Sequence, residues 1–126
     1  MFRRFLKCLK CLNIFKSKKI SQPAVESVLS ILVILKIRPE FRQKAFDSLK
    51  YDDDGIKLAK MRKGCISTEG RFSTDDKETI VILGRWATSQ DFEDYMKMRS
   101  DIGYWDKVGY MFASPPVFIH LSKDSF

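Results

Sequence analysis

The chain has 126 residues, enough for one hydrophobic core and too few for two full domains. Its composition, 44% hydrophobic with ten Phe, excludes a chain that is disordered throughout. The net charge of +7 comes from residues 1–20, which hold seven Lys and Arg and no acid, because residues 21–126 hold 16 basic and 16 acidic residues. A neutral domain offers no basic face, so no nucleic-acid partner is expected.

The basic segment, residues 1–20, begins with a predicted amphipathic helix over residues 1–16. Its apolar side chains share one face, opposite most of the basic ones: Phe2, Phe5, Leu6, Leu9 and Leu12 against Arg3, Lys7 and Lys10. An apolar face with a cationic rim is typical of a helix lying on an anionic membrane surface. A mitochondrial transit peptide and a helix docked on the domain or a partner are the alternatives.

The three cysteines, Cys8, Cys11 and Cys65, are an odd number and do not form a disulfide framework, which favours a reducing compartment. We therefore expect a cytoplasmic protein with peripheral membrane association. Cys8 and Cys11 are predicted lipidation sites, since acylation would add a second anchoring signal; inert thiols are the alternative. A zinc site would need Cys65 and His120 from distant elements, so no metal is predicted.

Residues 21–27 are a polar linker, and the first predicted element follows at residues 28–38. This stretch is aliphatic on both faces, which predicts a strand covered on both sides. Pro39 ends it and begins a helix with apolar residues at helical spacing, namely Phe41, Ala45, Phe46 and Leu49. Residues 52–55 predict a kink or restart with an Asp as the new cap, and Gly64 is the expected end of the helix.

A second strand is predicted at residues 65–73, with Ile66, Thr68, Gly70 and Phe72 on one face. After a turn at 74–77, a third strand runs over 78–86 and ends at Trp86. Ser89 is the predicted cap of the next helix, and residues 100–116 are predicted to be irregular with a short helix around 105–111. Val117, Ile119 and Leu121 form the last strand. The order β-α-β-β-α-β predicts a four-stranded antiparallel sheet with two helices on one face.

Residues 28–121 resemble the antibiotic-biosynthesis-monooxygenase-like (ABM) domain, followed by a tail at 122–126. The matching features are the steps Arg38-Pro39, Gly64-Cys65 and Arg85-Trp86, a capped helix with Phe92, and small residues and Pro before the last strand. The resemblance implies an α+β, ferredoxin-like fold. It also implies a homodimer, joined through the sheets into a dimeric α/β barrel. Apolar residues on both faces of 31–35, and Phe118, are expected to supply the dimer surface.

The resemblance further implies cofactor-independent oxygenation of quinol-like or polycyclic phenolic small molecules, or haem degradation in one branch. A haem-degrading relative has a His ligand on a helix. Here Tyr95 stands about where relatives often carry that His, and the single His, His120, is on the last strand. No cofactor is therefore predicted, and Tyr95 is the alternative ligand if haem binds.

Oxygenation without a cofactor needs a pocket that desolvates a phenol, a group that takes its proton, and donors for the anion. The catalytic candidates are His120 and Arg85, and the substrate-binding candidates are Trp86, Tyr95, Trp105 and Tyr104. The alternative for each is a structural role, since aromatic side chains commonly fill cores. The alternative function is a catalytically inactive dimeric ABM-like binding or scaffold module, tethered to a membrane by its N-terminal helix. A closed, mostly apolar pocket containing His120 or Arg85 would favour the enzyme.

Overall fold

The computed structural model describes residues 28–126. The predicted N-terminal helix and the lipidation of Cys8 and Cys11 lie outside these residues. No helix between residues 28 and 126 is long and apolar enough to cross a bilayer.

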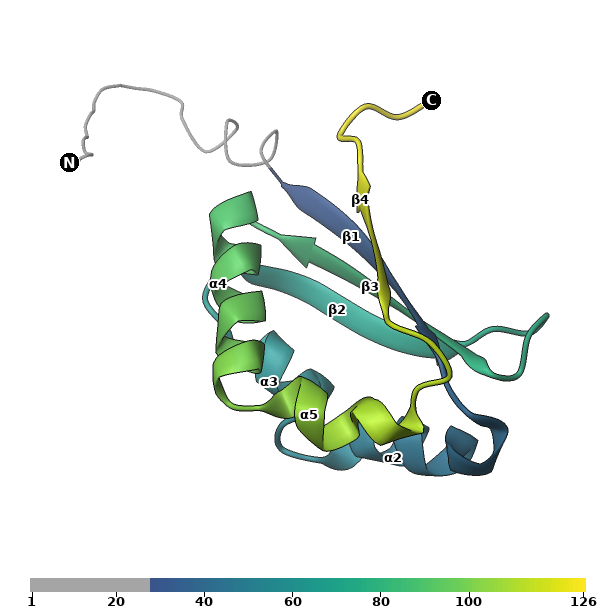
Figure 1. Cartoon of the computed structure of the whole chain (residues 1–126). Helices are drawn as coiled ribbons and strands as arrows, with labels where there is room; N and C mark the ends of the chain where they lie inside the picture. The colour runs from purple at the N-terminus through teal and green to yellow at the C-terminus, as the bar shows by residue number, and fades with distance from the viewer. Residues whose placement is uncertain (1–27) are drawn as a thin grey trace, which may run out of the picture.

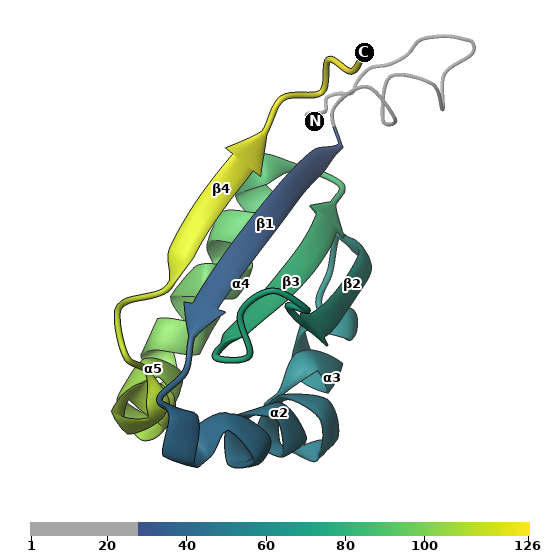
Figure 2. The same ribbon diagram turned by 90° about the vertical axis from the view of Figure 1, so that its right-hand side faces the viewer.

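Four strands form one antiparallel sheet in the order β2-β3-β1-β4 (Figure 1). They are β1 (Leu29–Lys36), β2 (Cys65–Phe72), β3 (Thr79–Trp86) and β4 (Val117–Leu121). The helices of residues 28–126 pack on one face of the sheet, as the second view shows (Figure 2). The predicted α+β ferredoxin-like fold is confirmed.

β1 lies inside the sheet because it is apolar on both faces. Ile31 and Leu35, both at most 3% exposed, face the helices together with Ile80 of β3, whereas Leu32 and Ile34 face the other side. The strand thus builds the floor of the core with one face and leaves a second apolar face uncovered by helices.

The first helical segment consists of η2 (Pro39–Phe41), α2 (Arg42–Tyr51) and α3 (Ile56–Lys60). The predicted break between α2 and α3 is confirmed, but the predicted Asp cap is wrong, because Gly55 occupies the N-cap position of α3. Gly55 lies so close to the end of α2 that a Cβ atom there would be 2.3 Å from the carbonyl oxygen of Leu49. The helix also ends at Lys60, before Gly64.

The second helical segment consists of α4 (Ser89–Asp101), α5 (Tyr104–Val108) and η3 (Gly109–Met111). Thr88, and not the predicted Ser89, caps α4: its hydroxyl accepts a hydrogen bond from the Asp91 N–H at 3.0 Å. The short helix predicted around residues 105–111 is confirmed by α5 and η3.

Two apolar residues lie on other faces than predicted. A bulge between Cys65 and Ser67 shifts the register of β2, so Ile66 is 50% exposed while Thr68 keeps its expected place toward the helices. Phe118 pairs with Val33 and lies on the helix-covered face against Trp105, with ring centroids 6.4 Å apart. Phe118 therefore adds nothing to the uncovered face.

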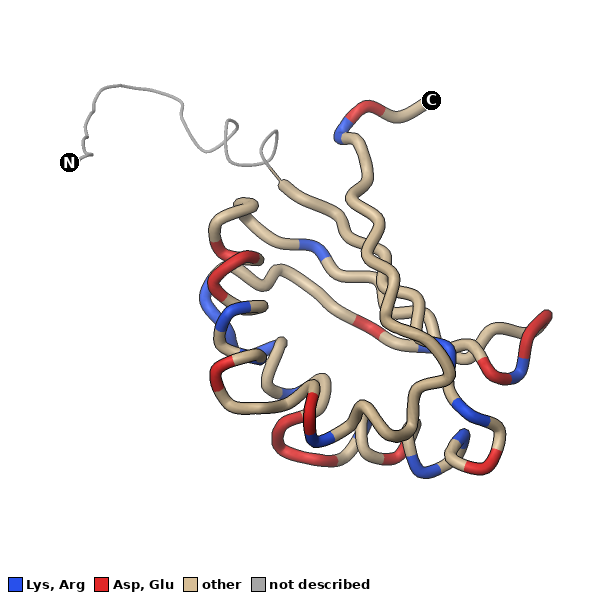
Figure 3. Tube along the Cα trace, in the orientation of Figure 1, with Lys and Arg blue, Asp and Glu red and all other residues tan. Residues whose placement is uncertain are grey.

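The uncovered face of the sheet is apolar over β3, β1 and β4. Leu83, Val117, Ile119 and Leu121 are exposed there, from 39% to 50%. Charged residues lie mostly on the helices and in the β2–β3 turn, and β4 carries none (Figure 3).

Candidate functional site

A cavity of about 340 Å³ lies between the sheet and the helices. It exists because small side chains point into it from the sheet, where Thr68 and Gly70 of β2 and Gly84 of β3 occupy helix-facing positions. Ala45 of α2 and Ala59 of α3 face it from the helices. Its volume falls in the range of small-molecule sites, which begins at about 300 Å³.

Aromatic side chains form much of the wall. Trp86 is 2% exposed and lies over Tyr95, with ring centroids 4.9 Å apart, and against Phe92 at 5.8 Å. Tyr104 and Trp105 of α5 meet edge to face at 5.3 Å. The four predicted substrate-binding residues, Trp86, Tyr95, Tyr104 and Trp105, thus all line one cavity.

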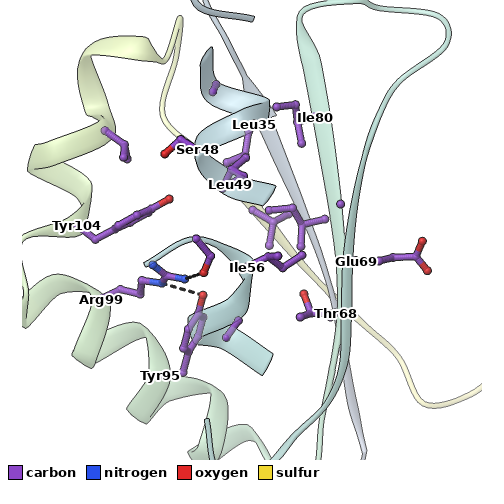
Figure 4. Close-up of a pocket in the computed structure, with 18 of the residues that line it drawn as sticks. Leu35, Ser48, Leu49, Ile56, Thr68, Glu69, Ile80, Tyr95, Arg99 and Tyr104 are labelled. Carbon is purple, nitrogen blue, oxygen red and sulfur yellow. Dashed lines mark hydrogen bonds between the residues drawn. The ribbon is translucent and has the colours of Figure 1, made fainter. Parts of the chain in front are cut away.

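The buried charged group in this wall is Arg99 of α4, which is only 3% exposed. Its Nε donates a hydrogen bond to the Tyr95 hydroxyl at 2.9 Å, and its Nη2 donates to the carbonyl oxygen of Gly55 at 2.8 Å. Nη1 donates to the carbonyl oxygen of Asp54, and the guanidinium carbon lies 4.2 Å from the centre of the Tyr104 ring. Figure 4 shows Arg99 between the two tyrosines.

Both tyrosines beside Arg99 keep their protons at neutral pH. Burial raises the pKa of Tyr104 to about 12, although Arg99 opposes the shift. Burial also raises the pKa of Tyr95, again against the effect of Arg99. Since Tyr95 accepts the bond from Arg99, its hydroxyl proton remains available for a bound molecule.

The two predicted catalytic residues lie outside the cavity lining. His120 is on the helix-covered face, but at the exposed end of β4, where its ring meets Phe92 at 5.9 Å. Arg85 pairs with Ser30 and is exposed on the uncovered face of the sheet. A mostly apolar cavity is therefore present, but it contains neither His120 nor Arg85, so the criterion set for the enzyme is met only in part.

Sequence reasoning missed Arg99, although a signal for it exists. Phe92, Tyr95 and Met96 mark the apolar face of α4, and the next position on that face, seven residues after Phe92, is Arg99. An Arg that continues an apolar stripe indicates a buried cation, which is costly unless something compensates it.

Other reactive groups are sparse in the described part of the chain. Residues 28–126 contain no group of three side chains placed to hold a metal ion. Cys65 is a free thiol, and burial raises its pKa although Lys60 opposes the shift. Its thiol is therefore protonated at neutral pH.

A scan against protein-family models found no match, and a search of curated proteins found none either. Solved structures do share the fold. A conserved protein from Methanosarcina mazei matches with a TM-score of 0.70 at 12% identity, over 82% of this chain and 99% of its own.

Two further matches are each named "Putative antibiotic biosynthesis monooxygenase". The Nitrosomonas europaea protein has a TM-score of 0.65 at 14% identity, over 76% of this chain and 89% of its own. The Bordetella bronchiseptica protein has a TM-score of 0.64 at 19% identity, over 79% and 99%. The predicted likeness to ABM domains is confirmed at the level of the fold.

Proposed function

We propose that residues 28–121 form a cofactor-independent monooxygenase-like domain that acts on quinol-like or polycyclic phenolic small molecules inside the cavity. The observation that carries this proposal is the buried guanidinium of Arg99 in an otherwise apolar, aromatic-walled space. The fold shared with proteins named as monooxygenases supports the same reading.

The cavity offers the groups that such a reaction needs to stabilise an anion. In a dry site, a phenolate or enolate is strongly stabilised by a cation and by fixed hydrogen-bond donors. Arg99 supplies the cation, and the hydroxyls of Tyr95 and Tyr104 supply donors. The electron-rich anion gives its electrons to dioxygen; one oxygen atom enters the product as a carbonyl, and the other leaves as water with two substrate hydrogens.

Oxygen consumption with a panel of hydroquinones and anthrones tests the proposal. Arg99→Gln should lower kcat about 100-fold or more, since loss of a donor that stabilises a developing anion costs that much. Lys97→Gln is the matched control, because this substitution also removes one positive charge from α4, but from its exposed side, and leaves the cavity intact.

Two further comparisons locate the reaction. Gly70→Val should raise KM, because it narrows the cavity without changing its charge, and the new Cβ would lie 3.4 Å from the Ile82 side chain.

His120→Ala and Arg85→Ala examine the roles predicted from the sequence, and unchanged turnover in both would remove these residues from the mechanism. Absence of turnover with every substrate would contradict the proposal.

The second candidate function is a catalytically inactive dimeric binding or scaffold module, tethered to a membrane by the N-terminal helix. The observation that favours it is the uncovered apolar sheet face, where Leu83 and Ile119 are about two-fifths exposed. A protein that forms dimers but consumes no oxygen with any of the substrates would support this module.

A further inference from the structure

Arg99 is a buried cation without an acidic partner. None of the ion pairs within residues 28–126 includes it, and its three hydrogen bonds all end on neutral oxygens, two of them backbone carbonyls. The nearby carboxylate of Asp54 is bound by Lys107 at 2.6 Å. A guanidinium carries five N–H groups, so two of them have no partner in the described part of the chain.

Two more buried polar groups in the cavity wall lack a partner within residues 28–126. The Tyr104 hydroxyl and the Thr68 hydroxyl make no hydrogen bond there, although the two residues are only 6% and 9% exposed. Figure 4 shows both side chains among those that line the cavity. Buried polar groups are nearly always satisfied, so orphaned donors that gather around one space indicate a molecule that accepts from them.

The same wall contains no group that could take a proton from that molecule. Its other charged residues are Lys50, Lys60 and Glu69. Glu69 points away from the cavity, to the far side of the sheet, where its carboxylate accepts a hydrogen bond from Arg71 at 2.8 Å (Figure 4). Tyr95 and Tyr104 are protonated and act as donors. The described lining therefore combines a cation and donors with no base.

We infer that the cavity takes up its ligand as an anion that has already formed in water, with the negative charge delocalised over two oxygens. Hydroxyquinones, enolates of 1,3-dicarbonyl compounds and aromatic carboxylates have this chemistry. The planar fork of Arg99 keeps one N–H on Nη1 and one on Nη2 without a partner among residues 28–126, and these two groups can donate to such oxygens. The Tyr104 hydroxyl, beside the guanidinium, can donate to the same ligand. The inference rests on the proposed function, in that it takes the cavity as the substrate site, and it narrows the quinol-like and phenolic substrates to those acidic enough to ionise in water.

The test compares two probes with the same ring system on the full-length protein. 2-Hydroxy-1,4-naphthoquinone is an anion at neutral pH, and 2-methoxy-1,4-naphthoquinone is neutral. Both Trp residues of the chain, Trp86 and Trp105, line the cavity, so quenching of their fluorescence reports binding. The hydroxy probe should bind about tenfold more tightly or better, as expected for a charge-assisted hydrogen bond. Equal affinity would overturn the inference and leave Arg99 a purely structural tie between α4 and the α2–α3 connection.

A third probe examines the missing base. 1-Naphthol has the same fused rings but ionises only in alkaline solution, and its anion has a distinct absorption spectrum. We expect it to bind weakly with the spectrum of the neutral molecule. The spectrum of the anion in the bound state at neutral pH would show that the protein takes the proton, and would overturn the inference.

Variants then assign the preference to Arg99. Arg99→Gln should abolish the preference for the hydroxy probe and leave the methoxy probe within about threefold, while Lys97→Gln should retain the preference. If Arg99→Gln does not fold, Arg99→Lys, which keeps the charge but loses the fork, should reduce the preference. A preference that persists in Arg99→Gln, or that is undiminished in Arg99→Lys, would overturn the role of Arg99.

The result separates this inference from the proposed function. Preferential binding of the anion without oxygen consumption would contradict the monooxygenase alone. Oxygen consumption with neutral quinols, together with equal affinity for the two naphthoquinones, would contradict the anion inference alone.

Discussion

Burial gives the tyrosines around Arg99 properties that their exposed counterparts lack. Tyr104 is 6% exposed, its hydroxyl lies in the cavity wall, and its pKa is raised to about 12 from an ordinary value of 10.0. The folded protein therefore resists ionisation of this side chain, while the unfolded chain ionises freely.

This difference predicts a loss of stability in alkaline solution. Between about pH 10 and 12 the unfolded state releases the Tyr104 proton and the folded state does not, so the free energy of unfolding falls as pH rises, by up to about 2–3 kcal/mol. Urea unfolding measured from pH 8 to 12 should show a smaller decline in Tyr104→Phe. The exposed Tyr110→Phe is the control and should keep the wild-type slope. Identical slopes in the wild type and Tyr104→Phe would contradict the prediction.

At the level of elements, two glycines in the left-handed conformation shape the ends of the helical segments. Gly64 has φ +86° between α3 and β2, and Gly103 has φ +74° between α4 and α5. Their surroundings differ: a Cβ at Gly64 would lie 2.5 Å from the Cβ of Asp91, whereas nothing lies within 4 Å of one at Gly103.

Alanine variants of these two glycines distinguish the cost of backbone strain from the cost of a steric clash. Gly103→Ala should lower the free energy of unfolding by about 1–2 kcal/mol, since an L-residue is strained in this conformation. Gly64→Ala should cost clearly more, because Asp91 and the start of α4 must also move. Urea unfolding of both variants measures the difference, and an equal or smaller loss for Gly64→Ala would show that α4 adapts without cost.

For the whole molecule, the uncovered sheet face leads us to propose a homodimer. β4 is an edge strand and presents Val117, Ile119 and Leu121 on that face, next to Leu32 and Leu83. A two-fold interface brings the same patch of each protomer together, so one apolar face can bury another. β4 carries no charged residue that would oppose such packing.

Sedimentation of the full-length protein tests this proposal. The wild type should be a dimer at concentrations on the order of tens of micromolar. The Ile119→Lys variant should be a monomer, because the dimer would bury a charge without a partner. Ile102→Lys is the control, since Ile102 is equally apolar and 54% exposed but lies at the end of α4. A monomeric wild type would count against the dimer.

The N-terminal segment is proposed to bring the molecule to anionic membranes. Its predicted apolar face and its seven basic residues would both contribute to membrane binding. Each basic residue near the membrane surface would contribute about 1 kcal/mol to the binding free energy. Deletion of residues 1–20 should abolish co-sedimentation with vesicles containing phosphatidylserine, and neutral phosphatidylcholine vesicles should bind the full chain weakly. Continued pelleting of the shortened protein would show that the domain itself binds the membrane.

The sequence by itself determined the architecture of the domain. Apolar strand patterns, Pro39 at a helix start and the break at residues 52–55 are local signals. They were sufficient for the order of elements and for an antiparallel sheet with helices on one face. The ferredoxin-like class came from the resemblance to ABM domains. The aromatic wall also followed from the sequence, since Trp86 and Tyr95 continue the buried faces of β3 and α4.

Only the tertiary structure decided which groups surround the charged residue that joins those aromatics. Arg85 follows Gly84 and precedes Trp86, but alternation along a strand puts it on the opposite face, and the single His lies at an exposed strand end. Arg99 comes to the cavity because the α2–α3 connection, more than forty residues earlier, offers the carbonyls of Asp54 and Gly55 to its guanidinium. Contacts between segments so far apart depend on how helices cross the sheet, which no local pattern of residues contains.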